Sequence, residues 1–419
     1  MNEQSESDAE LRRAWVEFCD SLKESGEFLF QDAVPDSPSE RAESFRFLTQ
    51  AIAMGFEFHV ENKNPLHPYL MRYFSPWRKQ GGDNADAMIL GAWIDGRNTY
   101  RIVGNRGSCH WLNFTVVRPR DDGARGGPLY DALEGMGYPY NLVLDAAPLP
   151  MTEMEFEWDG SFVVTLSPDP NPGNWIRTTP KTCVVRIRQF FADWENEDPI
   201  HARIELVGDP GPPPLLSPEQ FIARLRESAA FARASASYWP EGIASYGTIN
   251  EMVVQPQEIP PGPGESWSGR MDNNPKGQNA STNYRLELDE ALVLRFRPPK
   301  AYYWSFELDN IWITTMDYRW RFSSLNMTQA AVDPDGYVTV VLAHQDPGTA
   351  NWLDVSGWRA GYVNFRALLA ESVPEFTTEY LKFADLARAL PSTVTMIDAE
   401  GRRRQLRVRK NGIDRRFRV

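Results

Sequence analysis

The densest group of residues that could do chemistry lies between positions 302 and 320. Glu307 and Asp309 take alternate positions of a predicted strand there, which puts both carboxyl groups on one face. Asp317 and Arg319 follow a short distance along the chain. Paired carboxyl groups can act as acid and base on a polar substrate, and a guanidinium can stabilise developing charge. The segment therefore predicts a catalytic group made of Glu307, Asp309, Asp317 and Arg319.

Aromatic side chains accompany these residues and could stack on a ring-bearing ligand. Tyr303 belongs to the same strand face, and Trp312 and Trp320 follow it. The alternative is that Glu307 and Asp309 simply face water on the outer side of a sheet. Tryptophan is abundant, with 14 residues, and it also serves in ordinary cores. If the chain has one site, we expect it in this segment.

A second candidate is the loop GGDNADA, which precedes another predicted strand. Its glycines let the backbone approach a ligand closely, and its carboxylates could bind a cation or hydroxyl groups. The spacing of a calcium loop is not completed, however. The alternative is a structural turn whose Asp and Asn side chains cap the backbone. The ligand-binding candidates in this loop are Asp83, Asn84 and Asp86.

Other catalytic patterns are missing from the sequence. The five histidines lack the spacing of a metalloprotease motif, and the three cysteines lie far apart without thiolate-zinc spacing. No nucleophile elbow, phosphate-binding loop or dinucleotide fingerprint is present. We therefore expect neither a metal nor a cofactor.

Charge and hydropathy narrow the classes of partner. The formal net charge of −13 opposes binding to nucleic acid or to an anionic membrane surface. The polar start of the chain carries no secretory signal, and no apolar run reaches the roughly eighteen residues of a membrane helix. We expect a cytoplasmic protein with a small-molecule ligand, no nucleic-acid partner and no membrane. Assembly into a homo-oligomer stays open.

The elements that would carry these residues are mostly strands. Apolar residues at helical spacing predict a helix over 8–26 and a second one that starts at Ser39. Strand-like sequence follows as far as a Pro-rich boundary. After it, Ser217-Pro218 marks the start of another helix, which is expected to end near Trp239-Pro240.

The C-terminal part is predicted to contain a long loop, further strands, a helix and a hairpin. Residues 255–282 are rich in Pro, Gly and Asn and indicate a loop, either functional or disordered. A helix is expected at about 375–390, and a hairpin with the turn Ala399-Glu400-Gly401 after it. The basic tail would then dock on its own domain or hold an acidic partner.

An internal duplication predicts a common plan for these strands. Residues 159–191 and 335–369 share an Asp-Gly turn, an apolar strand, an Asp-Pro turn, an Asn-Trp pair and a strand with an arginine. Rare residues in one order seldom recur by chance, so we predict two β-sandwich units of one topology. Because both copies keep the Asn-Trp pair, we assign it a structural role. The matched residues are Asp159-Gly160 with Asp335-Gly336, Asp169-Pro170 with Asp346-Pro347, Asn174-Trp175 with Asn351-Trp352, Tyr100-Arg101-Ile102 with Tyr284-Arg285-Leu286, and Trp111 with Trp304, where the register could slip by one.

The predicted fold is mainly β with helical additions, that is, two tandem β-sandwich or jelly-roll-like units. The expected parts are an N-terminal helical cap (1–75), the first β-sandwich unit (76–208), a Pro-rich linker and helix (209–245), the second, jelly-roll-like unit (246–373), and a C-terminal helix with a basic hairpin (374–419).

Three runs of sequence carry a family resemblance. They are RAESFRFLTQAI, GGDNADAMILGAWIDGRNTYRIVGNRG and NWLDVSGWRAGYVNFRALL. With them the chain, from about residue 40 to 370, resembles the bacterial family called domain of unknown function 1214, which often accompanies domain of unknown function 1254. The resemblance implies a β-sandwich or jelly-roll in the C-terminal half and offers no catalytic residues. Two positions depart from the family pattern: Ala85 stands where a proline is expected, and Trp358 stands where a histidine is expected.

Three functions compete on these observations. The first is a cofactor-independent hydrolase or lyase for a small hydrophobic or ring-bearing metabolite, bound in the second β unit. The second is a carbohydrate- or lipid-binding module without chemistry. The third is a structural protein that binds a partner through the 255–282 loop and the basic tail.

Overall fold

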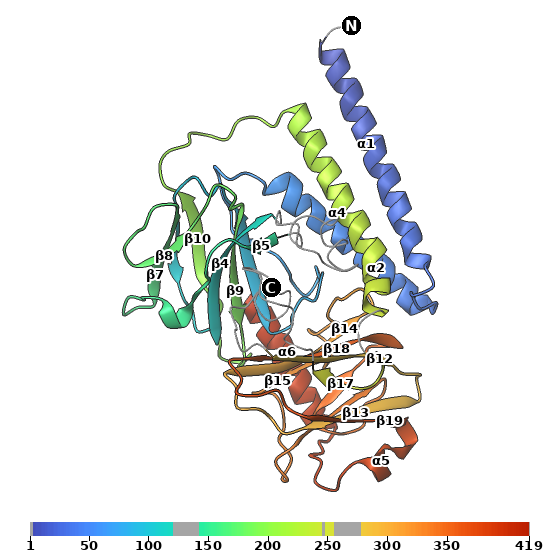
Figure 1. Cartoon of the computed structure of the whole chain (residues 1–419). Coiled ribbons are helices and arrows are strands. Elements are labelled where there is room, and N and C mark those ends of the chain that lie inside the picture. The colour runs from blue at the N-terminus through green and yellow to red at the C-terminus, as the bar shows by residue number, and fades with distance from the viewer. Residues whose placement is uncertain (1–2, 120–141, 245–247, 255–277, 419) are drawn as a thin grey trace.

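The computed structural model in Figure 1 describes residues 3–119, 142–244, 248–254 and 278–418. Within these ranges the chain is mainly β, with helices toward both ends, as the sequence predicts. Four sheets pair into two units that follow each other along the chain. None of the helices in the described ranges is long and apolar enough to span a membrane.

The first unit contains a six-stranded and a four-stranded sheet. The larger has the order β1-β2-β9-β4-β5, with β6 also paired to β4, and the smaller has the order β10-β3-β7-β8. The strands are β1 (Met71–Arg72), β2 (Ala87–Trp93), β3 (Tyr100–Asn105), β4 (Trp111–Pro119), β5 (Leu142–Leu144), β6 (Leu149–Pro150), β7 (Ser161–Ser167), β8 (Asn174–Arg177), β9 (Val184–Phe190) and β10 (His201–Leu206).

The second unit repeats this arrangement. Its five-stranded sheet has the order β11-β12-β18-β14-β15, and its four-stranded sheet has the order β17-β16-β13-β19. The strands are β11 (Val253–Val254), β12 (Gln278–Arg285), β13 (Glu290–Phe296), β14 (Tyr303–Asn310), β15 (Ser324–Asn326), β16 (Val338–Ala343), β17 (Trp352–Asp354), β18 (Ala360–Leu368) and β19 (Phe376–Lys382).

The two units have one topology, which confirms the predicted duplication. The larger sheets share the order β2-β9-β4 in the first unit and β12-β18-β14 in the second. The smaller sheets share the order β10-β3-β7-β8 in the first unit and β19-β13-β16-β17 in the second. Even the unusual parallel pair β7–β8 recurs as β16–β17. The Asp-Gly turns also agree, because Gly160 and Gly336 both have a φ of 81°, which glycine adopts without strain.

The Asn-Trp pair plays the structural role that its repetition predicts. Asn174 Nδ2 donates to the carbonyls of Glu155 and Val163, at 2.8 and 3.1 Å. Asn351 Nδ2 does the same to Ala331 and Thr339, at 2.8 and 3.2 Å. The following tryptophans both donate to the carbonyl that ends the neighbouring strand. The pair therefore ties the edge of each smaller sheet to a loop.

Two details of the predicted alignment are wrong. Trp111 lies opposite Phe190 and Tyr303 lies opposite Leu368, so the structural counterpart of Trp111 is Tyr303, one residue before Trp304. Tyr100 begins β3, whereas Tyr284 lies near the end of β12, the counterpart of β2. The short Tyr-Arg-apolar pattern fits many strands, which is why it misled the comparison.

Helices pack together on the N-terminal side of the molecule. The predicted first helix is α1 (Glu3–Glu27). The predicted second helix is α2, which begins slightly earlier than expected because Ser37 caps it. The predicted third helix is α4, which Ser217 caps as predicted but which runs through Pro240 to Ala244. Figure 1 shows α1 extending away from both β units along α4. These elements are α1, η1 (Phe28–Phe30), α2 (Pro38–Gly55), η2 (Phe56–Glu61) and α4 (Pro218–Ala244); a short η3 (Met151–Glu153) lies in the first unit.

The C-terminal predictions need the largest correction. Of the helix expected at about 375–390, residues 376–382 instead form β19, an edge strand paired with β13, and only residues 383–389 are helical. In place of the expected hairpin, the chain forms the helix α6 (Ala399–Phe417). Asp398 caps the N-terminus of this helix, because its side chain accepts a hydrogen bond from Gly401 N at 2.8 Å. Between β19 and α6 lie η4 (Phe383–Asp385) and α5 (Leu386–Ala389). The predicted 255–282 loop also needs revision, because 278–282 belong to β12; residues 255–277 lie outside the described ranges.

The spacing of the C-terminal arginines explains why this segment is helical. Arg402, Arg409 and Arg416 recur every seven residues, which places them on one helix face, and all three are buried. Figure 1 shows α6 passing between the two β units. Its residues Ile413 and Phe417 join the core of the first unit. The helix thus bridges the units along a mixed apolar and basic face.

Candidate functional site

The two segments that the sequence singled out separately lie against each other. Ala85 N, in the GGDNADA loop, donates to Glu307 Oε2 at 2.8 Å. Thr315 donates to both carboxylate oxygens of Asp83, through N at 3.0 Å and Oγ1 at 2.7 Å. Gly82 N donates to the Ile313 carbonyl at 2.7 Å. The loop of the first unit is therefore bonded to β14 of the second unit and to the segment that follows this strand.

Asp86 is the most heavily bonded carboxylate of this junction. It accepts hydrogen bonds from the Tyr303 hydroxyl at 2.5 Å, from Trp194 Nε1 at 2.6 Å and from Asn326 Nδ2 at 2.8 Å. Burial raises the pKa of Asp86, while these donors and the Arg416 charge oppose the rise. Asp86 and Tyr303, both predicted as ligand contacts, thus meet in a bond between the units.

Glu307 and Asp309 lie on the buried outer face of β14. Phe306 and Leu308 point the other way, into the core of the second unit. The carboxyl groups are 0% and 1% exposed, so the alternative in which they face water is wrong. One oxygen of each, Glu307 Oε1 and Asp309 Oδ1, has no hydrogen-bond partner in the described part of the chain.

Burial perturbs the pKa of both carboxyl groups. Burial and the neighbouring Asp309 charge raise the pKa of Glu307 well above its usual range. Burial raises the pKa of Asp309 to about 8, against the opposing effect of the Arg366 charge. Both shifts favour the protonated form, which is the direction expected of a carboxyl group used in acid catalysis.

Arg366 of β18 is the cation beside this pair, and the sequence prediction missed it. Arg319, the predicted cation, pairs instead with Asp414 at 2.7 Å and lies over the Trp320 ring at 5.0 Å. Asp317 is half-buried, and its backbone carbonyl accepts from Trp320 N and Arg321 N. The internal repeat aligns Arg366 of β18 with Arg188 of the first unit. Nothing in the sequence, however, showed that β18 pairs with β14.

The predicted aromatic platform does not form. Trp312 is fully buried, stacks on Phe47 at 4.7 Å and donates to Ser44 Oγ at 3.0 Å, so it anchors α2. Trp320 is 53% exposed, beside Arg319. Asn84 Oδ1 accepts from Asp86 N at 2.7 Å, which is the capping turn offered as the alternative for this loop. Trp312 and Asn84 therefore make structural contacts, and a ligand role for the exposed Trp320 stays a prediction.

Buried cations complete the junction. Lys79 Nζ donates to the carbonyls of Thr315, at 3.0 Å, and Met316. Burial lowers the pKa of Lys79, while Asp83 and Asp317 raise it. From α6, Arg416 donates to the Ala85 carbonyl at 2.5 Å, and burial lowers its pKa to about 10. The C-terminal helix therefore supports the loop that holds Glu307.

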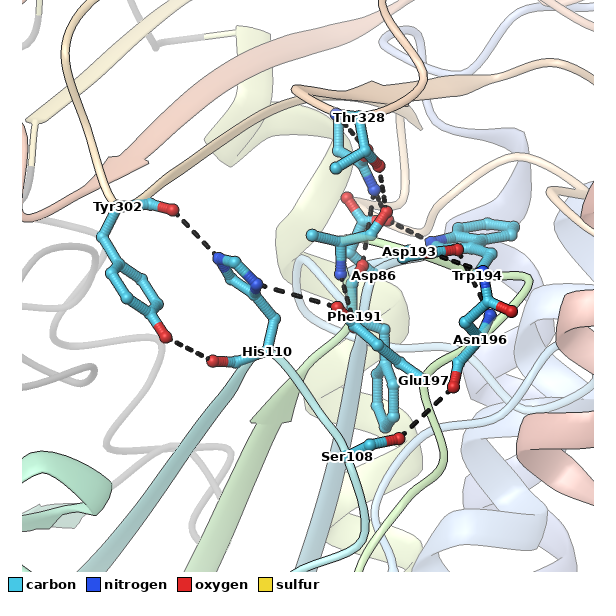
Figure 2. Close-up of polar contacts among 12 residues, drawn as sticks. Asp86, Ser108, His110, Phe191, Asp193, Trp194, Asn196, Glu197, Tyr302 and Thr328 are labelled. Atoms are coloured by element: carbon cyan, nitrogen blue, oxygen red, sulfur yellow. Dashed lines mark hydrogen bonds and ion pairs between the residues drawn. The ribbon is translucent and has the colours of Figure 1, made fainter.

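A second contact between the units, drawn in Figure 2, involves His110 and Tyr302. His110 Nε2 bonds the Tyr302 carbonyl at 3.0 Å, and the Tyr302 hydroxyl donates to the His110 carbonyl at 2.7 Å. Glu197 Oε1 lies 3.7 Å from His110 Nδ1 and raises the pKa of the imidazole. The sequence did not single out His110 or Tyr302 as a candidate, because each looks like an isolated polar residue there.

Metal-ligating side chains do not gather in the described ranges: no three His, Cys, Asp or Glu residues there are arranged to hold an ion. The described side chains at the site offer carboxyl, hydroxyl, amide and guanidinium groups. A carboxyl pair with a neighbouring guanidinium can move protons and stabilise charge.

Comparison with known proteins places the chain among relatives whose names state no activity. A crystal structure of an uncharacterized protein from Burkholderia cenocepacia is 30% identical and covers 91% of this chain and 100% of its own, with a TM-score of 0.79. A Vibrio parahaemolyticus protein is 12% identical and covers 80% of this chain and 98% of its own, with a TM-score of 0.38. No curated protein matches the chain.

The model of the family described as "Protein of unknown function (DUF1214)" matches residues 265–372. Glu307, Asp309 and Arg366 fall inside the matched range, whereas Asp83 and Asp86 lie outside it. Together with the near-complete structural match to the Burkholderia protein, this establishes the relationship expected from the GGDN and NWLD runs. The chain belongs to the DUF1214 family.

Proposed function

We propose that this protein is a cofactor-independent enzyme, of hydrolase or lyase type, that acts on a small metabolite at the outer face of β14 and β18. The observation that carries the proposal is the buried pair Glu307 and Asp309, each with one oxygen that no described residue bonds. Burial of such oxygens is unfavourable unless a ligand or water meets them. Perturbed, buried carboxyl pairs are typical of acid–base sites.

Each group near the pair has a separate part in the proposed reaction. Asp309, whose pKa is about 8, exchanges the proton with the substrate. Glu307 is held in place by the bond from Ala85 N, and its free oxygen accepts a hydrogen bond from the substrate. Arg366 stabilises negative charge that develops on the substrate, the task first assigned to Arg319.

The proposal includes the setting expected from composition. With a net charge of −13, we infer a cytoplasmic protein whose partner is a small molecule and not nucleic acid or membrane. Because Glu307 and Asp309 are buried, a substrate reaches them only when packed elements separate. We therefore expect association slower than the usual 10⁵–10⁷ per molar per second, by about tenfold or more.

Conservative substitutions test the proposal. Glu307→Gln keeps the acceptor for Ala85 N and Asp309→Asn keeps the volume, so both preserve packing while removing the exchangeable proton. We expect each to lower turnover of a library-identified metabolite at least about a hundredfold. Asp317→Asn serves as the matched control, because that carboxyl lies outside the pair, and it should leave turnover unchanged.

A structural role for the same residues predicts a different result. The Ala85–Glu307 bond joins the two units, so a purely structural carboxyl pair would affect stability alone. In that case Glu307→Gln and Asp309→Asn would leave turnover intact, or no compound of the library would be turned over by the wild type. A non-catalytic binding module would lose affinity and show no turnover to lose.

A further inference from the structure

Three acceptor atoms without partners gather on neighbouring strands of the second unit. They are Glu307 Oε1, Asp309 Oδ1 and Asn364 Oδ1, and none has a hydrogen-bond partner among the described residues. Glu307 lies directly opposite Asn364 in the β14–β18 register, and Asp309 lies two residues along β14. Directly opposite residues on an antiparallel pair share one face, with Cβ atoms about 5 Å apart. The three side chains therefore project from one face within reach of one small group.

The burial of these acceptors points to a donor that is missing from the structure. Asn364 is 7% exposed, and the two carboxyl groups are at most 1% exposed. Buried acceptors in folded proteins are almost always bonded. An alkylammonium group carries three N–H donors and no acceptor, whereas a hydroxyl carries one donor and also needs an acceptor site of its own. Three converging acceptors thus match an ammonium group.

We propose that this face binds the primary ammonium group of a small ligand, with Glu307 and Asp309 as its counter-charges and Asn364 as the third acceptor. The inference rests on the proposed function and names its substrate class, an amine-bearing metabolite. Both carboxyl oxygens of the buried Asp83 and Asp86 accept hydrogen bonds. Arg366, the cation beside Glu307 and Asp309, donates to neither of their free oxygens.

The duplication supports a site that is specific to the second unit. By strand register, the counterparts of Glu307, Asp309 and Asn364 in the first unit are Thr115, Val117 and Arg186. The first unit therefore replaces both carboxyl groups and the amide acceptor, although its sheet has the same topology. A purely architectural requirement of the sheet would apply to both copies.

Benzylamine and benzyl alcohol are a matched pair of probes, because they differ only in the ammonium and hydroxyl groups. We expect benzylamine to raise the melting temperature of the full-length protein and to bind measurably by calorimetry, and benzyl alcohol to do neither. Bound ammonium favours the ionised carboxyl groups, so calorimetry in buffers of different ionisation enthalpy should show proton release.

Asn364→Leu and Asn113→Leu form the pair of variants. Asn113 is another fully buried asparagine with both amide atoms unpartnered among the described residues, and it belongs to the first unit. Both substitutions change a buried amide to an apolar side chain, but only Asn364→Leu removes an acceptor of the proposed site. We expect Asn364→Leu to weaken benzylamine about tenfold, since a hydrogen bond to a charged donor is lost, and Asn113→Leu to leave it unchanged. Thermal unfolding of both variants confirms that they fold.

The inference is overturned if benzylamine and benzyl alcohol bind alike, if no protons are released, or if both variants weaken benzylamine equally. These outcomes are separable from failure of the proposed enzyme. Amine binding without any effect of Glu307→Gln and Asp309→Asn on turnover would keep the ammonium site and remove the acid–base role. If the wild type turns over a substrate that has no amine, and those two variants do not, the acid–base role would be kept and the ammonium site would be removed.

Discussion

His110 and Tyr302 occupy equivalent positions immediately before β4 and β14, and each side chain bonds the backbone carbonyl of the other residue. Next to them, the equivalent residues Trp111 and Tyr303 share one apolar cluster with Phe190 and Leu368, which are equivalent to each other. The two units thus meet through corresponding strand ends, so the duplication that built the fold also built the contact between its copies.

This reciprocal contact makes stability depend on pH through His110. Glu197 and the Tyr302 carbonyl raise its pKa in the folded protein above the unfolded value of about 6.5, while Arg106 and Cys109 are the other titratable groups near this contact. A raised pKa contributes stability that is fully present below about pH 6.5 and is lost as pH rises through the folded value. We expect the melting temperature of wild type to exceed that of His110→Gln by more at pH 5.5 than at pH 8.5. A constant difference between those pH values would show that His110 does not titrate in this contact.

The contribution of Asp309 to stability also decreases as pH rises, but over a range that extends to about pH 8. Its pKa rises from about 4 in the unfolded chain to about 8 in the fold, so ionisation opposes folding as pH increases between these values. Asp83, Glu307, Lys79 and Arg366 are the charged groups that act on it. We expect Asp309→Asn to gain stability relative to wild type from pH 5 to pH 8, measured by urea unfolding. Parallel curves for the two proteins would contradict the raised pKa.

The buried arginines of α6 are expected to matter far more than the exposed ones. Arg416 lies 4.2 Å over the Phe191 ring, acts on the buried Asp86 and donates to the Ala85 carbonyl, so Arg416→Met leaves that carbonyl without its charged donor. Loss of a buried hydrogen bond to a charged group costs about 1.5–3 kcal/mol. Arg404→Met, on the exposed face of the same helix, should change the unfolding free energy by less than about 0.5 kcal/mol. Similar effects of the two substitutions would refute the bridging role of α6.

The Asn-Trp pair should be equally important in both units. Asn174→Ala and Asn351→Ala each leave buried backbone groups of a sheet edge and a loop without their partner, which costs about 1–3 kcal/mol. Asn411→Ala, at an exposed position of α6, is the control. Urea unfolding of the three variants should show two comparable losses and no loss in the control. A large loss of unfolding free energy in only one of the two variants would contradict an equal stabilising role of the Asn-Trp pair in both units.

Sequence reasoning worked where the pattern was local or repeated. The Ser217 cap, the strand alternation around Glu307 and the repeated Asn-Trp pair each carry their structural meaning within a few residues. It failed for β19 and α6, because an edge strand with polar residues resembles a helix, and the alternating basic and apolar residues of α6 resemble a hairpin strand. The burial of Arg402, Arg409 and Arg416 depends on partners far away in the chain.

The candidate site was only half predictable for the same reason. Glu307, Asp309, Asp83 and Asp86 were found by residue type, but their meeting depends on how the two units dock. Arg366 replaced Arg319 because cross-strand neighbours are set by the register between β14 and β18, which sequence periodicity does not reveal. Trp312 proved to be a core residue, because residue type alone does not separate a core tryptophan from a ligand platform.

The most direct test of the site is a thermal-shift screen of wild type and the Glu307→Gln/Asp309→Asn double variant against one library of ring-bearing metabolites, including amines. We expect at least one compound to stabilise the wild type, in the presence of a chelator, and to lose most of that effect in the double variant. Equal shifts in both proteins, or stabilisation by added metals alone, would contradict a ligand site at the carboxyl pair.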